Sequence, residues 1–194
     1  YRRQRQMCIR DRSVASTKAF YAQVAAGMLL AVGLAERIAG PSASPDQSLL
    51  QGLRSLPEAM ETVLETARPR IAQAAQRHAP FRRSWAVVGS GPNLIAANEL
   101  RIKCSELCYK AIACDVIEDK KHIDLSSEPL ILVCAAGLSG STGDDIAKEI
   151  AIYRAHKAAP IAIVNAGDDR YRAALEVIEV PVVPTELGFI LSAM

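Results

Sequence analysis

The sequence predicts an α/β protein built on a doubly wound, parallel sheet of five strands flanked by helices. From residue 84 onward, short and continuously apolar runs alternate with segments of helical periodicity. Strands buried on both faces have this continuous apolar character, and their alternation with helices is typical of a parallel sheet. Half of the 194 residues are apolar and 23% are charged, which indicates a globular chain.

Helices are predicted before the sheet. Ser13–Gly40 begins with Ser and Thr residues that suit an N-cap and continues as a helical pattern to the glycine. Pro41–Pro45 is predicted as a linker. Asp46–Arg77 carries leucines at helical spacing, and we expect Pro57 and Pro69 to divide it into two or three helices.

The first of these helices contains a nearly continuous apolar stretch, Ala19–Ala35. Its length of about 17 residues is short for a bilayer span. Its Ala and Gly content favours a helix packed in a protein core. We therefore predict no membrane partner.

The predicted strands are Trp85–Gly89, Ala111–Val116, Pro129–Ala135, Pro160–Val164 and Val177–Val180. A helical run follows Asn93, and further helices are predicted at Asp144–Ala155 and at Pro184–Met194. In such a sheet, ligands bind at the carboxyl ends of the strands, near helix N-termini.

Residues 1–12 differ from the rest of the chain. They hold five arginines and one aspartate, a local charge of +4 in a chain of formal net charge +2. The remainder is thus slightly acidic and forms no basic patch for nucleic acid. Met7–Asp11 can be back-translated to a transposon-type sequencing adapter, so we interpret residues 1–12 as an adapter-like, non-native segment. The alternative is a basic arm that binds nucleic acid or a membrane surface. We expect the natural protein to extend beyond both ends of the remaining sequence.

The cysteines Cys104, Cys108, Cys114 and Cys134 show no paired spacing typical of a zinc site. No secretory signal precedes them. We expect reduced, mostly buried thiols in a cytoplasmic protein, with no metal and no cofactor.

Two loops follow predicted strands. Gly89–Asn93 is Gly-rich but lacks the full dinucleotide fingerprint, so a tight turn is a sufficient explanation. Gly137–Gly143 holds the hydroxyls of Ser139, Ser141 and Thr142 directly before a predicted helix, which suits substrate contact through a phosphate group. A loop that only caps the helix is equally consistent with this pattern.

The stretch from Glu99 to His122 carries the residues suited to catalysis. On a helix, Glu99, Lys103 and Glu106 fall at i, i+4 and i+7 and share one face. A carboxylate base, a cation and an imidazole can move protons on a sugar. A solvated helix face held by weak ion pairs is the alternative for this pattern.

The motifs together resemble the sugar-isomerase (SIS) family, and more closely the isomerase region of the glutamine–fructose-6-phosphate aminotransferases. Val14–Phe20 is similar to the family's VASTKAF motif, and Trp85–Gly91 to the first strand and turn of its second subdomain. Lys103–Tyr109 resembles the helix KLKEISY, and Lys121–His122 the KH pair at matching separation. By this resemblance, residues 13–79 are the last helix of a first SIS subdomain plus a helical linker, and residues 80–194 are a truncated second subdomain.

The resemblance implies roles for particular residues. It implies that Glu106 moves a proton between sugar C1 and C2, that Lys103 polarises the sugar and the base, and that His122 opens the sugar ring. In the family this histidine is supplied across a homodimer. Further contacts to a phosphosugar substrate are implied for Glu99, Val14 and Ser16.

The chemistry would be aldose–ketose isomerisation of fructose 6-phosphate toward glucosamine 6-phosphate, through an enediol-like intermediate at a buried glutamate. We expect this chain alone to be inactive even if the full-length parent is an enzyme. Two alternatives stay open: a non-catalytic SIS module that binds a phosphosugar and regulates a partner, and an SIS deglycase.

Overall fold

The computed structural model describes residues 17–40, 47–122 and 125–194, and it separates into two compact units between Ser55 and Leu56. The first unit contains helix α2 (Thr17–Ala39) and the start of α3 (Gln47–Thr66). The second unit contains the sheet and the remaining helices. The domain boundary predicted between residues 79 and 80 stays a prediction.

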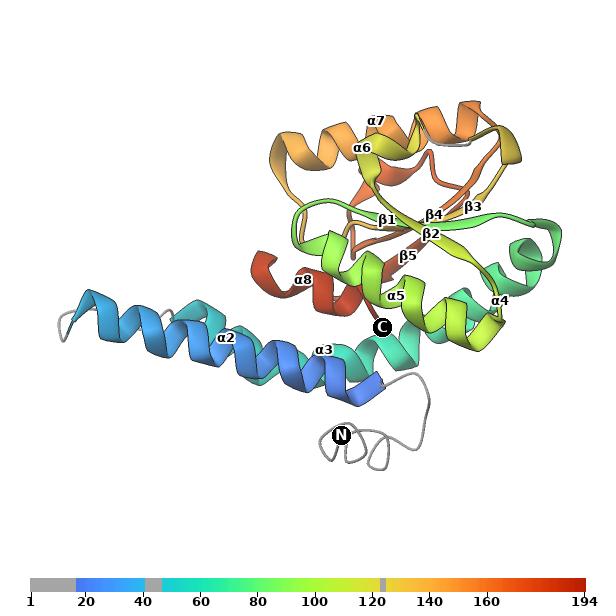
Figure 1. The fold of residues 1–194 in the computed structure, drawn as a ribbon. Coiled ribbons are helices and arrows are strands. Elements are labelled where there is room, and N and C mark those ends of the chain that lie inside the picture. Colours follow the sequence, from blue (N-terminus) through green and yellow to red (C-terminus); the bar gives the residue numbers. More distant parts are fainter. Residues whose placement is uncertain (1–16, 41–46, 123–124) are drawn as a thin grey trace. The chain divides into compact units, whose positions relative to one another are not determined.

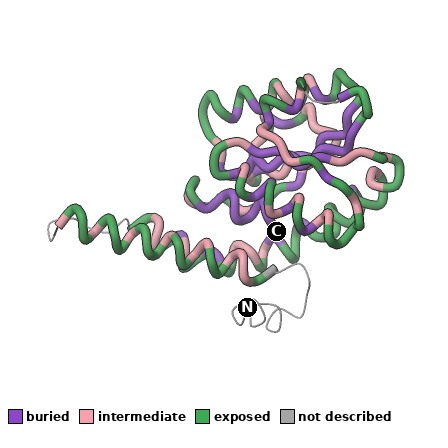
Figure 2. Tube along the Cα trace, in the orientation of Figure 1, coloured by how far each residue is buried: buried purple, intermediate pink, exposed green. Residues whose placement is uncertain are grey.

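Helix α2 contributes no buried residue among those described (Figure 2). Leu30 and Ile38 are 63% and 86% exposed. The prediction of a packed core helix is therefore wrong for this chain, because α2 and the start of α3 are too few elements to enclose a helix. Within the described part of the chain, one helix is long and apolar enough to cross a membrane by length and composition alone, and it is Lys18–Ala39.

The two prolines of the helical region behave differently. Pro69 lies in the first turn of α4 (Arg68–His78), where the missing N–H has no intrahelical partner to lose. Pro57 lies inside α3, so the predicted break there is wrong. Leu56 and Val63 are both buried, and this anchoring on either side of Pro57 offsets the loss of one backbone hydrogen bond.

The second unit is built on a five-stranded, all-parallel sheet with the strand order β2-β1-β3-β4-β5, which confirms the predicted fold class. Trp85 of β1 pairs with Ile112 of β2 and with Leu130 of β3, so the three strands start in register. The strands are β1 (Trp85–Gly89), β2 (Ile112–Val116), β3 (Leu130–Cys134), β4 (Ala159–Asn165) and β5 (Glu176–Val180).

Helices cover both faces of this sheet (Figure 1). On one face lie α4, α5 (Pro92–Cys108) and α8 (Thr185–Ser192). On the other lie α6 (Ile117–Lys120) and α7 (Gly140–Ala155), and these two helices contact each other. The described residues of this unit also form three short 3-10 turns: η1 (Ala79–Phe81), η2 (Leu125–Ser127) and η3 (Asp169–Tyr171).

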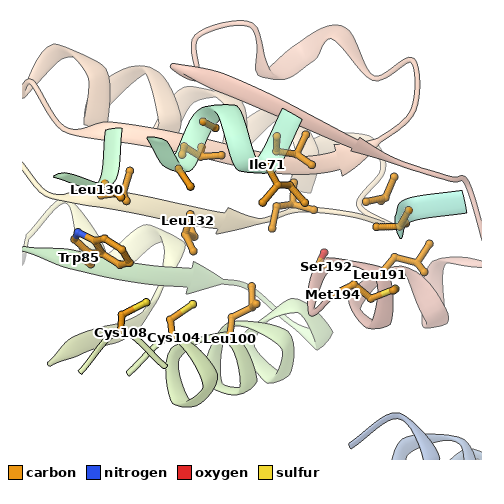
Figure 3. Close-up of a pocket in the computed structure, with 18 residues that line it drawn as sticks. Ile71, Trp85, Leu100, Cys104, Cys108, Leu130, Leu132, Leu191, Ser192 and Met194 are labelled. Atoms are coloured by element: carbon orange, nitrogen blue, oxygen red, sulfur yellow. The ribbon is translucent and has the colours of Figure 1, made fainter. Parts of the chain in front are cut away.

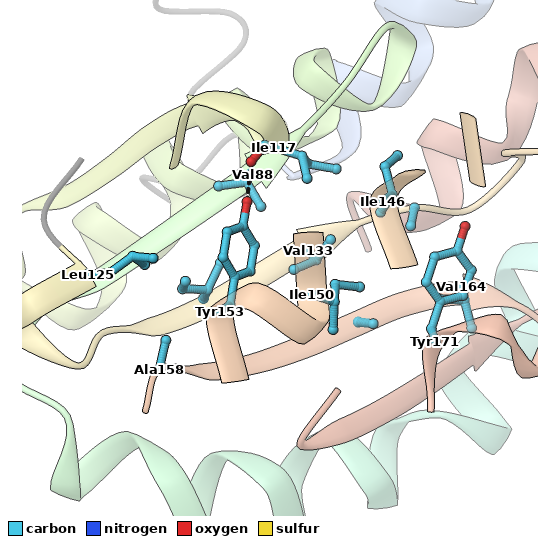
Figure 4. Packing of buried hydrophobic residues seen from close by; sticks show 13 residues of the cluster. Val88, Ile117, Leu125, Val133, Ile146, Ile150, Tyr153, Ala158, Val164 and Tyr171 are labelled. Atoms are coloured by element: carbon cyan, nitrogen blue, oxygen red, sulfur yellow. Dashed lines mark hydrogen bonds between the residues drawn. The ribbon is translucent and has the colours of Figure 1, made fainter. Parts of the chain in front are cut away.

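The core under α7 is tightly filled (Figure 4). Tyr153 of α7 is fully buried, and its hydroxyl donates a hydrogen bond to the carbonyl of Ile117. This bond ties α7 to the start of α6. Burial raises the pKa of the Tyr153 hydroxyl well above its usual value, so the tyrosine keeps the proton that it donates.

The opposite face of the sheet holds an apolar cavity of about 320 Å³ (Figure 3). Its walls come from α4, α5, α8 and the strands, and Trp85, Leu132 and Cys104 are among the residues that line it. Of the four cysteines in the described residues, which form no disulfide, Cys134 is buried, Cys104 and Cys114 are half-buried, and Cys108 is exposed. The prediction of mostly buried thiols is therefore wrong, because α5 turns its last residue outward.

Helix α4 is tied to the edge strand β5 by charged side chains. Glu176 of β5 accepts from Arg77 at 2.6 Å and lies 3.1 Å from Nε2 of His78. Arg70 pairs with Glu179 at 3.6 Å. The hydrogen bond with His78 and the one with Arg77 hold the pKa of Glu176 below its ordinary value.

Candidate functional site

Helix α5 brings together the three charged residues expected on one face. Lys103 is buried, and its ammonium contacts the carboxylate of Glu99 one turn earlier. Burial lowers the pKa of Lys103, while the negative charge of Glu106 opposes that shift. Glu106 itself is exposed, so the expectation of a buried glutamate base is wrong for this chain. The structure therefore places a buried ammonium beside a carboxylate that solvent or a ligand can reach.

His122 lies on the other side of the sheet from Glu106. It follows α6 by two residues and is exposed, whereas α5 packs on the opposite face (Figure 1). Strands β1 and β2 lie between α5 and α6. Val14 and Ser16 lie outside the described residues, so their expected contacts are not tested.

The loop Gly137–Gly143, called the hydroxyl loop below, has a different structure from the one expected. Ser139 is the extended N-cap, and α7 begins at Gly140, so Ser141 and Thr142 belong to its first turn and the predicted start at Asp144 is wrong. The helix starts early because Arg170 holds this turn from outside. Ser139, Ser141 and Thr142 are all exposed.

Arg170 is the residue that organises this loop, and the sequence patterns did not single it out. Its guanidinium donates to the carbonyls of Leu138 and Gly140, both at 3.2 Å, and to Asp144 at 3.4 Å. It also binds both carboxylate oxygens of Asp168, at 2.9 and 2.5 Å. These contacts engage all five N–H donors of an arginine. They raise the pKa of Arg170 further above its usual value and lower that of Asp168.

A buried hydrogen-bond network fixes the preceding part of the same loop. Nδ2 of Asn93, at the start of α5, donates to the carbonyl of Ala136 at 2.8 Å. Ser192 of α8 donates to Oδ1 of Asn93 at 2.9 Å and accepts from the N–H of Ala136 at 3.3 Å. Oδ1 of Asn165 accepts from the N–H of Gly137 at 3.0 Å. The loop after β3 is therefore a rigid platform, held from three separate elements.

A polar cleft of about 470 Å³ opens beside this platform, at the carboxyl edge of the sheet. It brings the Gly-rich turn and the hydroxyl loop together, through Ser90 and Thr142. The other lining residues are Ile117, Glu118, Asp145, Ile146, Lys148 and Glu149. Among the described residues, no group of three or more His, Cys, Asp and Glu could hold a metal ion.

Comparisons with known proteins agree with this architecture. No family model matches the chain. The chain is 33% identical over 184 residues to an isomerizing glutamine–fructose-6-phosphate aminotransferase of Thermus thermophilus. That match covers 93% of the chain but 30% of the relative, so the chain spans less than a third of the length of this relative.

Solved structures share the fold. A protein of Silicibacter pomeroyi described as a phosphosugar isomerase superposes with a TM-score of 0.73 at 24% identity, over 93% of the chain and 50% of that protein. The sugar isomerase domain of an RpiR transcription factor from Sphaerobacter thermophilus gives 0.59 at 14% identity, over 76% and 86%. The Vibrio vulnificus NanR protein complexed with ManNAc-6P gives 0.55 at 12% identity, over 86% and 60%.

The parallel five-stranded sheet, its helical layers and these matches define a sugar-isomerase domain, and the chain belongs to the SIS family. Within that family, it is distantly homologous to the isomerase region of glutamine–fructose-6-phosphate aminotransferase.

Proposed function

We propose that this chain is the second SIS unit of a phosphosugar isomerase that resembles glutamine–fructose-6-phosphate aminotransferase, with the α5 face as one wall of its active site. One observation carries the proposal. Lys103 is buried against Glu99, whereas Glu106, one turn further along α5, is exposed. Removing an ammonium from water costs free energy, and the ammonium of a simple surface ion pair usually stays solvated.

The arrangement suits proton transfer on a sugar. The Glu106 carboxylate would remove the proton from one carbon and return it to the neighbouring one, because a single carboxylate can serve as base and then as acid. The Lys103 ammonium would stabilise the enediolate oxygen that develops between the two steps. Glu99 would hold Lys103 in place. His122 would act from the partner copy, since the sheet separates it from Glu106 in one chain.

Substrate contacts for the hydroxyl loop are also part of the proposal. Ser139, Ser141 and Thr142 present exposed hydroxyls, but Asp144 follows directly and Arg170 has no N–H left for an anion. These hydroxyls would therefore contact the polyol part of a sugar better than its phosphate. The phosphate contact itself would have to come from elsewhere in the assembled parent.

A second candidate function is a regulatory SIS module that binds a phosphosugar without converting it. The structural similarity to the sugar isomerase domain of a transcription factor favours it. Such a module needs no base, so the buried lysine beside an exposed glutamate favours the isomerase instead.

The test is the Glu106→Gln variant of the parent protein that contains this chain, assayed with fructose 6-phosphate in heavy water. Loss of a general base is expected to slow deuterium exchange at the reacting carbons by about 10²- to 10⁴-fold, while sugar-phosphate binding changes less than about twofold. Glu65→Gln, an exposed glutamate of α3, is the matched control. Undiminished exchange in Glu106→Gln would exclude the catalytic role, and retained binding would then favour the regulatory module.

A further inference from the structure

The short helix α6 carries the segment from which His122 projects. It spans Ile117–Lys120, only four residues, and His122 follows two residues after its end. The backbone N–H of His122 donates to the carbonyl of Asp119 at 2.9 Å, so the histidine is joined to the last turn of the helix. Four residues are too few for a helix to be stable without contacts from its surroundings. The position of His122 therefore depends on what holds α6.

Helix α7 contacts α6 at both of its ends. Tyr153 donates from its buried hydroxyl to the carbonyl of Ile117, the first residue of α6 (Figure 4). Glu149, one turn earlier on α7, accepts from the ammonium of Lys121 at 2.5 Å, directly after the end of α6. The spacing i, i+4 places Glu149 and Tyr153 on one face of α7. A single face of α7 therefore fixes the start and the end of the segment that leads to His122.

A buried ion pair adds a third contact, from the sheet. The ammonium of Lys120 lies 3.6 Å from Oδ2 of Asp115 on β2, and the side chain of Lys120 is 5% exposed. Oδ2 of Asp115 and Oε2 of Glu149 are buried without a hydrogen-bond partner among the described residues. Buried charges with incomplete partners cost free energy, and apolar side chains of similar size would cover α6 at a lower cost. What these directional contacts add is one defined position for α6.

We propose that Glu149 and Tyr153 are positioning residues for His122. Through α6 they fix the backbone from which the imidazole reaches a sugar, and neither of them contacts the sugar itself. The inference rests on the proposed function, in which His122 opens the sugar ring. It assigns to α7 a part in catalysis that is separate from the α5 face, which packs on the other side of the sheet.

The first experiment measures the position of the histidine without any substrate, by ¹⁵N relaxation of the labelled chain. Tyr153→Phe removes the hydroxyl and keeps the ring in the core, and Glu149→Leu removes the carboxylate. In each variant the backbone order parameter of His122 is expected to fall from about 0.85 to below about 0.6, while that of Leu132 on β3 stays near the rigid value. Arg154→Gln, at the exposed residue next to Tyr153, is the control. An unchanged order parameter at His122 in both variants would overturn the inference.

The second experiment separates ring opening from proton transfer in the parent protein that contains this chain. The analogue 5-deoxyfructose 6-phosphate lacks the hydroxyl that closes the fructose ring, so it needs no ring opening. Glu149→Leu and Tyr153→Phe are expected to slow deuterium exchange into fructose 6-phosphate by about tenfold or more and to leave exchange into the analogue unchanged. Glu149→Gln keeps an acceptor for Lys121 and is expected to restore part of the rate. A protein that is only destabilised loses both rates in equal proportion, and that result would overturn the inference.

Two further variants keep this inference apart from the proposed function. His122→Ala should show the same selective loss, and adding Tyr153→Phe to it should slow exchange no further, because the tyrosine acts through the histidine. A further loss in the double variant would overturn the inference. If Glu106→Gln retains exchange into both sugars while the order parameter of His122 falls as expected, the proposed function fails and the positioning of His122 by α7 is supported.

Discussion

Arg170 lies so close to Gly143 that a β-carbon added to the glycine would overlap the guanidinium of Arg170. The same guanidinium holds the carbonyls of Leu138 and Gly140. The glycine is thus required by a side chain 27 positions away and not by its own backbone conformation, since it lies within α7.

The first prediction is a reversal of sign in a double-mutant cycle. Gly143→Ala should destabilise the chain by about 1–2 kcal/mol, because it displaces Arg170 from its five hydrogen bonds. In an Arg170→Ala background the same substitution should stabilise by about 0.5–1 kcal/mol, the ordinary gain of Ala over Gly inside a helix. Urea unfolding of the four proteins measures the cycle. Equal effects of Gly143→Ala in both backgrounds would show that the arginine does not make the glycine necessary.

The second prediction concerns the network beneath the loop after β3. Ser192→Ala should cost about 1–3 kcal/mol of unfolding free energy, because it leaves the N–H of Ala136 and Oδ1 of Asn93 buried without their partner. Ser141→Ala, at an exposed serine of α7, should change stability by less than about 0.5 kcal/mol. Thermal and urea unfolding compare the two variants. A loss below that of Ser141→Ala would mean that water replaces the serine hydroxyl.

The third prediction concerns how Asp168 makes the free energy of unfolding depend on pH. Hydrogen bonds from Arg170 lower the pKa of Asp168 in the folded chain. The unfolded state therefore binds a proton at higher pH than the folded state does. The contribution of Asp168 to the stability of the folded chain is fully present above about pH 4, and it is lost as the pH falls through the lowered pKa of the folded state. The acid arm of the stability curve should be shallower in Asp168→Asn than in the unmodified chain. Parallel acid arms would remove Asp168 as a cause of acid unfolding.

The sheet was predictable because its three inner strands, β1, β3 and β4, are almost continuously apolar and buried. Trp85–Gly89 occurs as expected, and each end of the other four strands lies within one residue of its expected position. The start of α7 was not predictable from local pattern. It depends on Arg170, whose contacts with the loop come from a turn that follows a different strand.

The charged face of α5 illustrates a second limit. The spacing of Glu99, Lys103 and Glu106 correctly placed them on one face, because helix periodicity is local. It could not show that Lys103 is buried and Glu106 exposed, since that depends on what packs against the helix. Nor could a separation of 16 residues between Glu106 and His122 show that a sheet lies between them.

The ion pairs between α4 and β5 have a consequence for the chain in solution. An edge strand exposes backbone groups that can pair with the edge of another molecule and so start aggregation. β5 is such an edge, and it carries Glu176 and Glu179, whose charges are held in place by Arg77 and Arg70. If β5 of a second molecule paired with this edge, its carboxylates would lie close to those of Glu176 and Glu179 and repel them. The same contacts that fasten α4 therefore also protect the sheet from growing by one more strand.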